Sequence, residues 1–325
     1  MLDIISIGSA TRDVFLENVP FIIQKNKKSP TNYFASLPLG SKIEIKNVLF
    51  ETGGGGTNTA VTFNRLGLKA GIISVVGNDP SGKEIIANLK KEKVNTIFIT
   101  TNEKKATGYS VILLTPKGER TILVHRGVSN LFNKNKIPWN KLKSQWFYIS
   151  SLGGNVELLK QLVDHANKNK IKTAINPGSL ELKAGFKKLK PILNKINILI
   201  LNREEASKLV KKPYNNLPLI LKTLQKKLES IIAITDGPRN AFVIDNGKTY
   251  EAQPLNVKII NTTGAGDAFG SAFTSGIILK NDVDYALRLA ILNSNYVITK
   301  MGAKKGLLKK RPSKQELKKV KIIIK

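Results

Sequence analysis

The chain has 325 residues, of which 41% are hydrophobic, so it can bury a large core in a single domain spanning 1–325. No apolar run approaches the roughly 20 residues that a membrane-spanning helix needs, and the first residues lack a secretory signal pattern. We therefore expect a cytoplasmic protein with no membrane partner. The absence of cysteine excludes disulfides, thiolate metal ligands and cysteine nucleophiles.

The formal net charge of +30 raises nucleic acid as a partner. The lysines are, however, scattered in short clusters along the whole chain, mostly on the polar faces of the expected helices. We therefore do not expect specific nucleic-acid binding, and a noncatalytic nucleic-acid-binding protein is the least favoured alternative.

Short β-rich apolar runs alternate with helical patterns, which predicts an α/β fold: a doubly wound, mostly parallel sheet flanked by helices. The strands are expected at 4–8, 71–77, 96–99, 146–150, 172–176, 196–201 and 231–235. The helices between them are expected at 58–66, 82–91, 156–167, 203–210 and 218–228. Farther on, Asn246-Gly247 predicts a hairpin, long helices are expected at 264–279 and 283–299, and a capping box at Ser313 starts a last helix.

Two stretches, 14–50 and 107–126, break this alternation. They are predicted to be antiparallel strands outside the main sheet, the second stretch folding around a Pro116-Lys117-Gly118 turn. We expect them to form a small β-stranded lid over the carboxyl edge of the sheet. Exposed edge strands tend to pair, so a homodimer through the lid is also predicted.

Candidate site residues appear early in the chain. Asp13 follows the first expected strand, where a carboxylate can bind two vicinal hydroxyls or simply serve a turn. Four consecutive glycines, of which Gly53 and Gly54 are the first, then lead into a helix that carries Asn58. Each glycine costs about 0.5–1 kcal/mol relative to alanine, which favours close backbone approach to a polar small molecule over a flexible turn.

A second candidate follows the strand at 196–201. Asn202, with Glu205 three residues later, can steer hydrated Mg²⁺ beside phosphates, because that ion keeps most of its waters. The same spacing is also a capping box, with Asn202 as the N-cap and Glu205 reaching back to it.

The most informative run is Asn261-Thr262-Thr263-Gly264-Ala265-Gly266-Asp267. The backbone amides of Gly264, Ala265 and Gly266 can converge on a phosphate at the positive end of an apolar helix. Asp267 then stands where it can accept a proton from an attacking hydroxyl. An ordinary helix start explains the run less well, because two glycines beside a cap weaken a helix.

These motifs, taken together, resemble those of the ribokinase-like carbohydrate kinases, also called the phosphofructokinase-B type, over nearly the whole chain. They occur in the order that the family has: Asp13; Gly53-Gly54 with Asn58; Gly77-x-Asp79-x-x-Gly82; Asn202 with Glu205; Thr235-Asp236-Gly237; Thr263-Gly264-Ala265-Gly266-Asp267; and Asn293 with Gly302-Ala303.

The resemblance implies an ATP-dependent sugar kinase. Its acceptor would bind to Asp13, Gly53, Gly54 and Asn58, and Asp267 would be the general base. The amides of Gly264, Ala265 and Gly266 would form the anion hole. The resemblance further implies that Asn202 and Glu205 organise Mg²⁺ and that ATP lies against Thr235, Gly237 and Asn293.

Two questions stay open at this stage. Family members that depend on K⁺ often carry aspartate where this chain has Asn261, so a K⁺ requirement is in doubt. The nearest alternative activity is that of an adenosine-like nucleoside kinase, for which Phe15, Phe21, Tyr33 and Phe34 offer an aromatic slot for a base.

Overall fold

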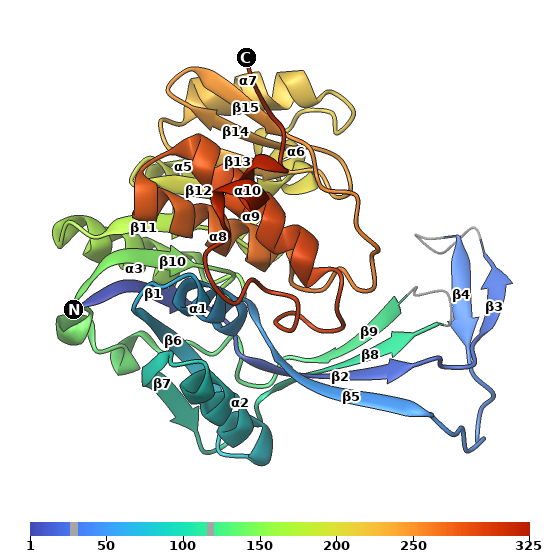
Figure 1. Cartoon of the computed structure of the whole chain (residues 1–325). Helices are drawn as coiled ribbons and strands as arrows, with labels where there is room; N and C mark the ends of the chain where they lie inside the picture. The colour runs from blue at the N-terminus through green and yellow to red at the C-terminus, as the bar shows by residue number, and fades with distance from the viewer. Residues whose placement is uncertain (27–31, 116–119) are drawn as a thin grey trace.

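The computed structural model describes residues 1–26, 32–115 and 120–325. Within them, ten strands form one large sheet in the order β16-β15-β14-β13-β12-β11-β10-β1-β6-β7 (Figure 1). The pairing from β13 to β7 is parallel throughout, and β14, β15 and β16 are antiparallel. The strand bounds are β1 Leu2–Ile7, β6 Ala70–Gly77, β7 Asn95–Asn102, β10 Ser144–Ile149, β11 Lys172–Ile175, β12 Ile198–Asn202, β13 Ile231–Thr235, β14 Ala241–Asp245, β15 Lys248–Ala252 and β16 Ile322–Ile324.

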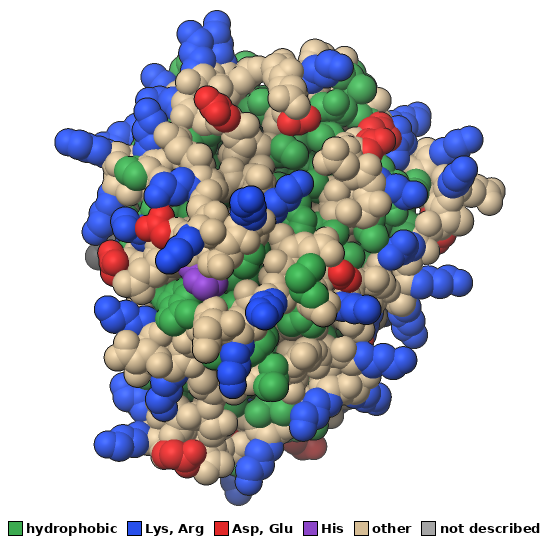
Figure 2. Space-filling view, turned by 90° about the vertical axis from the view of Figure 1, so that its left-hand side faces the viewer, with side chains coloured by type: hydrophobic (Ala, Val, Ile, Leu, Met, Phe, Trp, Pro, Cys, Tyr) green, Lys and Arg blue, Asp and Glu red, His purple; other side chains and the backbone are tan. Residues whose placement is uncertain are grey.

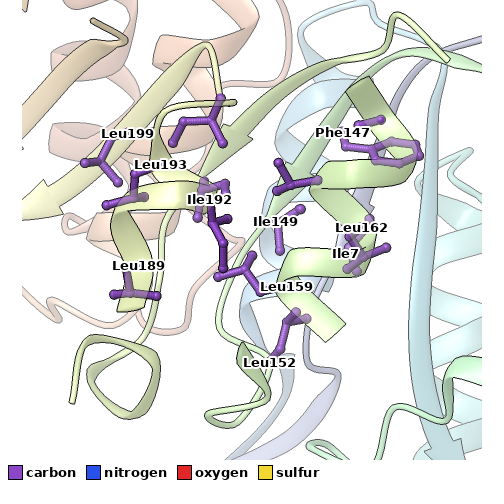
Figure 3. Close-up of a cluster of buried hydrophobic side chains, with 14 of the residues drawn as sticks. Ile7, Phe147, Ile149, Leu152, Leu159, Leu162, Leu189, Ile192, Leu193 and Leu199 are labelled. Atoms are coloured by element: carbon purple, nitrogen blue, oxygen red, sulfur yellow. The ribbon is translucent and has the colours of Figure 1, made fainter. Parts of the chain in front are cut away.

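Alternating side chains of the central strands enter two separate cores, because successive residues of a strand point to opposite faces. In β1, Ile5 and Ile7 pack into one core while Ile4 packs into the other. In β10, Phe147 joins the first core and Tyr148 the second. Figure 3 shows part of the first core, where aliphatic side chains from two helices meet the strands.

Helices cover both faces of the sheet, as a doubly wound fold requires. The first core is covered by α3 Val156–Lys168, α5 Gly185–Leu193, α6 Arg203–Val210 and α7 Leu217–Lys227. The opposite face is covered by α1 Gly55–Arg65, α2 Pro80–Lys91, α8 Ala265–Lys280, α9 Val283–Val297 and α10 Lys314–Lys318. A short helix, α4 Ser179–Leu182, precedes α5.

A smaller β-stranded region, which we call the lid, extends from one side of this body (Figure 1). It consists of a four-stranded sheet, β5-β2-β8-β9, and a two-stranded antiparallel sheet, β3-β4. The bounds are β2 Thr11–Glu17, β3 Ile22–Lys25, β4 Tyr33–Ser36, β5 Asn47–Gly53, β8 Gly108–Leu114 and β9 Arg120–His125. A small apolar cluster of Phe15, Ile112 and Leu114, with Leu49 packed against it, joins β2, β8 and β5.

The predicted fold class is confirmed, with one correction in the lid. The pairs β2-β5 and β8-β9 are antiparallel as expected, but β2 and β8 pair in parallel. The two strands come from segments far apart in sequence, so no hairpin turn dictates their direction. The predicted Pro116-Lys117-Gly118 turn lies outside the described residues. In the ranges that the structure describes, no helix is long and apolar enough to cross a membrane.

Candidate active site

The predicted acceptor and base residues meet where the lid joins the body, near the carboxyl ends of the parallel strands. Asn58, on α1, donates from Nδ2 to Oδ2 of Asp267 on α8 at 2.8 Å, across 209 positions of sequence. A Cβ added at Gly55 would lie 3.4 Å from Oδ1 of Asp267, so the glycine run passes directly beside the carboxylate. In open α/β sheets, ligands bind at this edge.

Asp267 is partly exposed as a residue, while its carboxyl group is enclosed by protein atoms. Burial raises the pKa of its carboxyl group, while the hydrogen bond from Asn58 and the charge of Lys304 act in the opposite direction. The Oδ1 atom of Asn58 is buried without a hydrogen-bond partner among the described residues. A buried acceptor of this kind can accept a hydrogen bond from a donor on a bound molecule, such as an alcohol.

No side chain caps the start of α8, and within the turn the Ala265 amide donates to the Thr262 carbonyl oxygen at 3.3 Å. Gly264 is the N-cap in a left-handed conformation, with φ of 78°, and provides no side-chain cap. A Cβ at Gly264 would lie 2.6 Å from the Cβ of Ala303, so only glycine fits there. At Gly266, an added Cβ would meet no atom within 4 Å, so there is open space beside the first turn of the helix. The first amides of α8 can therefore receive an anion such as a phosphate.

Asp13 lies on β2, inside the base of the lid, and is only 7% exposed. Its Oδ1 accepts a hydrogen bond from Oγ1 of Thr11 at 3.2 Å. A Cβ at Gly53 would lie 1.9 Å from Oδ2 of Asp13, so the glycine lets the backbone approach this carboxylate. Burial raises the pKa of Asp13, and the Lys304 charge is the largest opposing influence.

Asn202 and Glu205 form the capping box that the sequence also permitted. The Asn202 side chain accepts from the Glu205 amide, and the Glu205 carboxylate accepts from the Asn202 amide, both at 2.8 Å. Burial raises the pKa of Glu205, so a nearby cation would stabilise its charged form. Mg²⁺ keeps several waters and binds through one or two carboxylates plus phosphates, which this pair fits. Nowhere in the described ranges do three or more His, Asp or Glu side chains form a cluster able to hold a metal by themselves.

The predicted nucleotide residues divide into two groups. Thr235 pairs with Asn202 in adjacent parallel strands, and Gly237 follows it on an exposed turn, so both lie beside the capping box. Asn293 is fully buried: it donates to the Ala268 carbonyl and accepts from the Leu308 amide, each at 2.9 Å. The structure brings the first group to the sheet edge and holds Asn293 within the packing of α8 and α9.

Asn261, at the position relevant to K⁺, also has both ends of its amide engaged. Its Oδ1 accepts from the Thr263 amide at 2.6 Å, and its Nδ2 lies 3.1 Å from the sulfur of Met301. This pairing supports the turn that leads into Gly264.

Two contacts at the site were not predicted from the sequence. Arg120, on β9 of the lid, donates to Oγ1 of Thr262 at 2.6 Å and so joins the lid to the turn before α8. Lys304 is buried beside Thr52 and interacts with the charges of Asp13 and Asp267. In a chain with 53 lysines and arginines, the sequence carries no signal that separates Lys304 from a surface lysine.

A doubly wound body, a lid, open amides at a helix N-terminus and a carboxylate beside them define the class: a phosphotransferase with an alcohol group as acceptor. Comparison with known families identifies it further. The chain belongs to the pfkB family of carbohydrate kinases, whose sequence profile matches residues 27–310.

Individual relatives agree with this assignment. The chain is 26% identical to the ribokinase of Haemophilus influenzae over 286 residues, covering 85% of this chain and 89% of the relative. The structure of Arabidopsis thaliana ribokinase complexed with ribose and ATP matches with a TM-score of 0.78 at 20% identity, covering 98% of both chains. The Methanocaldococcus jannaschii nucleoside kinase matches with a TM-score of 0.75 at 18% identity, covering 98% of this chain and 97% of that one.

Proposed function

We propose that this protein transfers the γ-phosphoryl group of ATP to a hydroxyl group of a small carbohydrate. The observation that carries the proposal is the 2.8 Å hydrogen bond between Asn58 and Asp267. This bond places the glycine-rich segment before Asn58, where we propose that the acceptor binds, next to the carboxylate of Asp267 at the start of α8. A phosphoryl-transfer enzyme needs the acceptor hydroxyl and the amides that bind the phosphate to lie next to the same general base.

In the proposed reaction, Asp13 and Asn58 bind acceptor hydroxyls, and Asp267 accepts the proton of the hydroxyl that attacks the γ-phosphorus. The new O–P bond forms as the bond from the γ-phosphorus to the bridging oxygen breaks, and ADP leaves with the electron pair. The first amides of α8, from Gly264 to Gly266, stabilise the negative charge on the equatorial oxygens. A raised pKa on a buried carboxyl group makes Asp267 a stronger base than a surface aspartate.

The cofactor and nucleotide roles belong to the same proposal. Mg²⁺ at Asn202 and Glu205 would neutralise charge on the phosphates of ATP. Thr235 and Gly237, on the adjacent strand end and turn, would contact the nucleotide. The Asp236 carboxylate stabilises the turn that carries Gly237, because it accepts hydrogen bonds from the guanidinium groups of Arg203 at 2.7 Å and Arg239 at 2.8 Å. We further propose that the whole chain acts as one kinase domain, with segments 14–50 and 107–126 as its lid. A cytoplasmic location and a homodimer formed through the lid remain predictions.

Nucleoside phosphorylation is the second candidate, favoured by aromatic side chains on the lid. Tyr33 and Phe34 on β4 are 54% and 49% exposed, so both aromatic rings reach the surface of the lid. Phe15, which the sequence also offered, is fully buried in the lid cluster and is not available. The fold match to a nucleoside kinase is compatible with this alternative.

A release assay distinguishes the candidates. ADP formation would be measured with ribose, fructose, 2-keto-3-deoxygluconate, fructose phosphates, adenosine and other nucleosides, each with wild type and Asp267→Asn. The proposal predicts acceptor-dependent ADP release with a sugar, a phosphorylated product of matching mass, and its loss in the variant. ADP release that is the same with and without every acceptor would contradict it, and release with nucleosides alone would select the second candidate.

A further inference from the structure

Lys304 is an unusual lysine for its location. It lies in the loop after α9, follows Gly302 and Ala303, and is only 5% exposed. Lysine is almost never fully buried unless its charge is paired. A buried ammonium group beside a candidate active site therefore calls for a function.

The loop around Lys304 is clamped between the two halves of the candidate site. The ammonium group donates to the carbonyl oxygen of Thr52 at 2.5 Å and to its Oγ1 at 3.1 Å, directly before Gly53. On the other side of the loop, Ala303 packs against Gly264 of the anion-hole turn. The backbone of Lys304 is held in turn by Arg65, which donates to its carbonyl oxygen at 2.9 Å.

Four carboxylates from four elements interact electrostatically with this ammonium group. They are Asp13 on β2, Glu51 on β5, Asp267 on α8 and Glu92 at the end of α2, and each favours the charged form of Lys304. Burial acts more strongly in the opposite direction and lowers the lysine pKa to about 8. The interaction is mutual, because the Lys304 charge lowers the pKa of Asp13 and of Asp267 against the larger effect of their own burial.

We propose that Lys304 is a positioning residue of the transfer reaction: its buried ammonium ion keeps Asp13 and Asp267 ionised and fixes the backbone at Thr52. The inference rests on the proposed function, since it assigns Asp267 the role of base. Without a cation, two carboxylates enclosed in one site would favour protonation, and a protonated Asp267 cannot accept the hydroxyl proton. Lys304 is thereby an internal counter-ion shared by the acceptor side and the transfer side of the site.

The charge coupling can be measured without any substrate. In protein labelled with ¹⁵N at the lysine Nζ atoms, the Lys304 signal would be assigned by its loss in Lys304→Met and then titrated with pH. We expect its pKa to fall by about 0.5–1 unit in Asp13→Asn and in Asp267→Asn, because each variant removes a facing negative charge. The matched control is Asp164, a carboxylate on α3 that pairs with other lysines. Asp164→Asn should leave the pKa of Lys304 unchanged. An unchanged Lys304 titration in both site variants would overturn the inference.

Kinetics tests the consequence for the base. In Lys304→Met, the acidic limb of the kcat/KM profile should move to higher pH by about 0.5–1 unit, so the loss of rate should be largest on the acidic side of the profile. Lys304→Gln retains a donor for Thr52 without the charge and should show the same shift of the limb. If Lys304→Gln has the same pH profile of kcat/KM as wild type, Lys304 acts only as a structural hydrogen-bond donor, and the inference is refuted.

The adjacent Lys305 provides the matched control for these kinetics. It is half exposed and pairs with Glu51 at 2.7 Å, so Lys305→Met removes the same charge from the same loop and should leave the acidic limb in place. If wild type phosphorylates no acceptor, the proposed function fails, and the Nζ titration still decides whether Lys304 couples to the two aspartates.

Discussion

Replacing Asp267 by asparagine isolates proton acceptance from every other property of the site. The amide has nearly the same volume, and its oxygen can still accept the 2.8 Å hydrogen bond from Asn58. The backbone amides at the start of α8, which no side chain caps, are untouched by this substitution, so anion stabilisation should persist. The expected loss is therefore that of a positioned general base, a factor of about 10²–10⁴ in kcat. At 1.36 kcal/mol per tenfold, this corresponds to about 3–5 kcal/mol of transition-state stabilisation.

The stability of Asp267→Asn should change in the opposite direction from its activity. Burial raises the folded-state pKa of Asp267 above its unfolded value, so protonation favours the folded state and this contribution is lost as pH rises through the folded pKa. At neutral pH the wild type thus carries a buried charge that the variant lacks. The melting temperature of the variant at pH 7 should equal or exceed that of wild type, and any advantage should vanish at acidic pH.

The assays for this variant are steady-state ADP release, calorimetric binding of ATP and acceptor, and thermal unfolding. Binding within about threefold of wild type, together with the loss in kcat, is the expected pattern. Near-normal turnover would refute the role of Asp267 as a base. A variant that loses ATP binding or melts at a much lower temperature would show that the carboxylate is needed for structure instead.

Three further outcomes follow from local geometry. Gly264→Ala should lower kcat at least tenfold and reduce the melting temperature, because the backbone φ of 78° and the 2.6 Å approach of its new Cβ to the Cβ of Ala303 both oppose a side chain. Gly266→Ala is the control: its Cβ would enter open space, so this variant should melt like wild type. Asn58→Asp places a second carboxylate against Asp267, so the acidic limb of kcat/KM should shift to higher pH; an unshifted limb would deny their contact. Asp79→Ala removes the N-cap of α2 and its hydrogen bonds to the base of the lid, and denaturant unfolding should register a loss of about 2–4 kcal/mol.

The sequence predicted the body of the fold well, for a physical reason. Buried parallel strands are continuous apolar runs, and the range predicted at 231–235 coincides with β13. The helix predicted at 203–210 likewise coincides with α6, and a capping box marks its start. Helix α5 was missed because Pro191 lies inside it, and proline usually ends a helix; here Leu189, Ile192 and Leu193 pack into the core and support it.

The lid and parts of the site depended on contacts between distant segments. Parallel pairing of β2 with β8 joins residues about a hundred positions apart, and local sequence has no signal for its direction. The family resemblance did imply that Asp267 and the glycine run belong to one site, and the 2.8 Å contact with Asn58 agrees with that expectation. It could not predict Lys304, since burial of one lysine among many is a tertiary property.

On the face shown in Figure 2, Lys and Arg side chains are spread over the surface and do not gather into one basic patch. This distribution agrees with the scatter of lysines along the sequence. Filter retention of nonspecific DNA at physiological salt should therefore detect no binding.

The central claim is that one carboxylate faces an acceptor alcohol and the phosphate end of ATP at the same time. A crystal structure with a non-hydrolysable ATP analogue and the acceptor identified by ADP release tests it most directly. We predict an acceptor hydroxyl about 2.6–3.2 Å from an Asp267 carboxylate oxygen and the terminal phosphate against the amides of Gly264 to Gly266. A triphosphate bound away from the start of α8, or an acceptor with no hydroxyl near Asp267, would contradict the account.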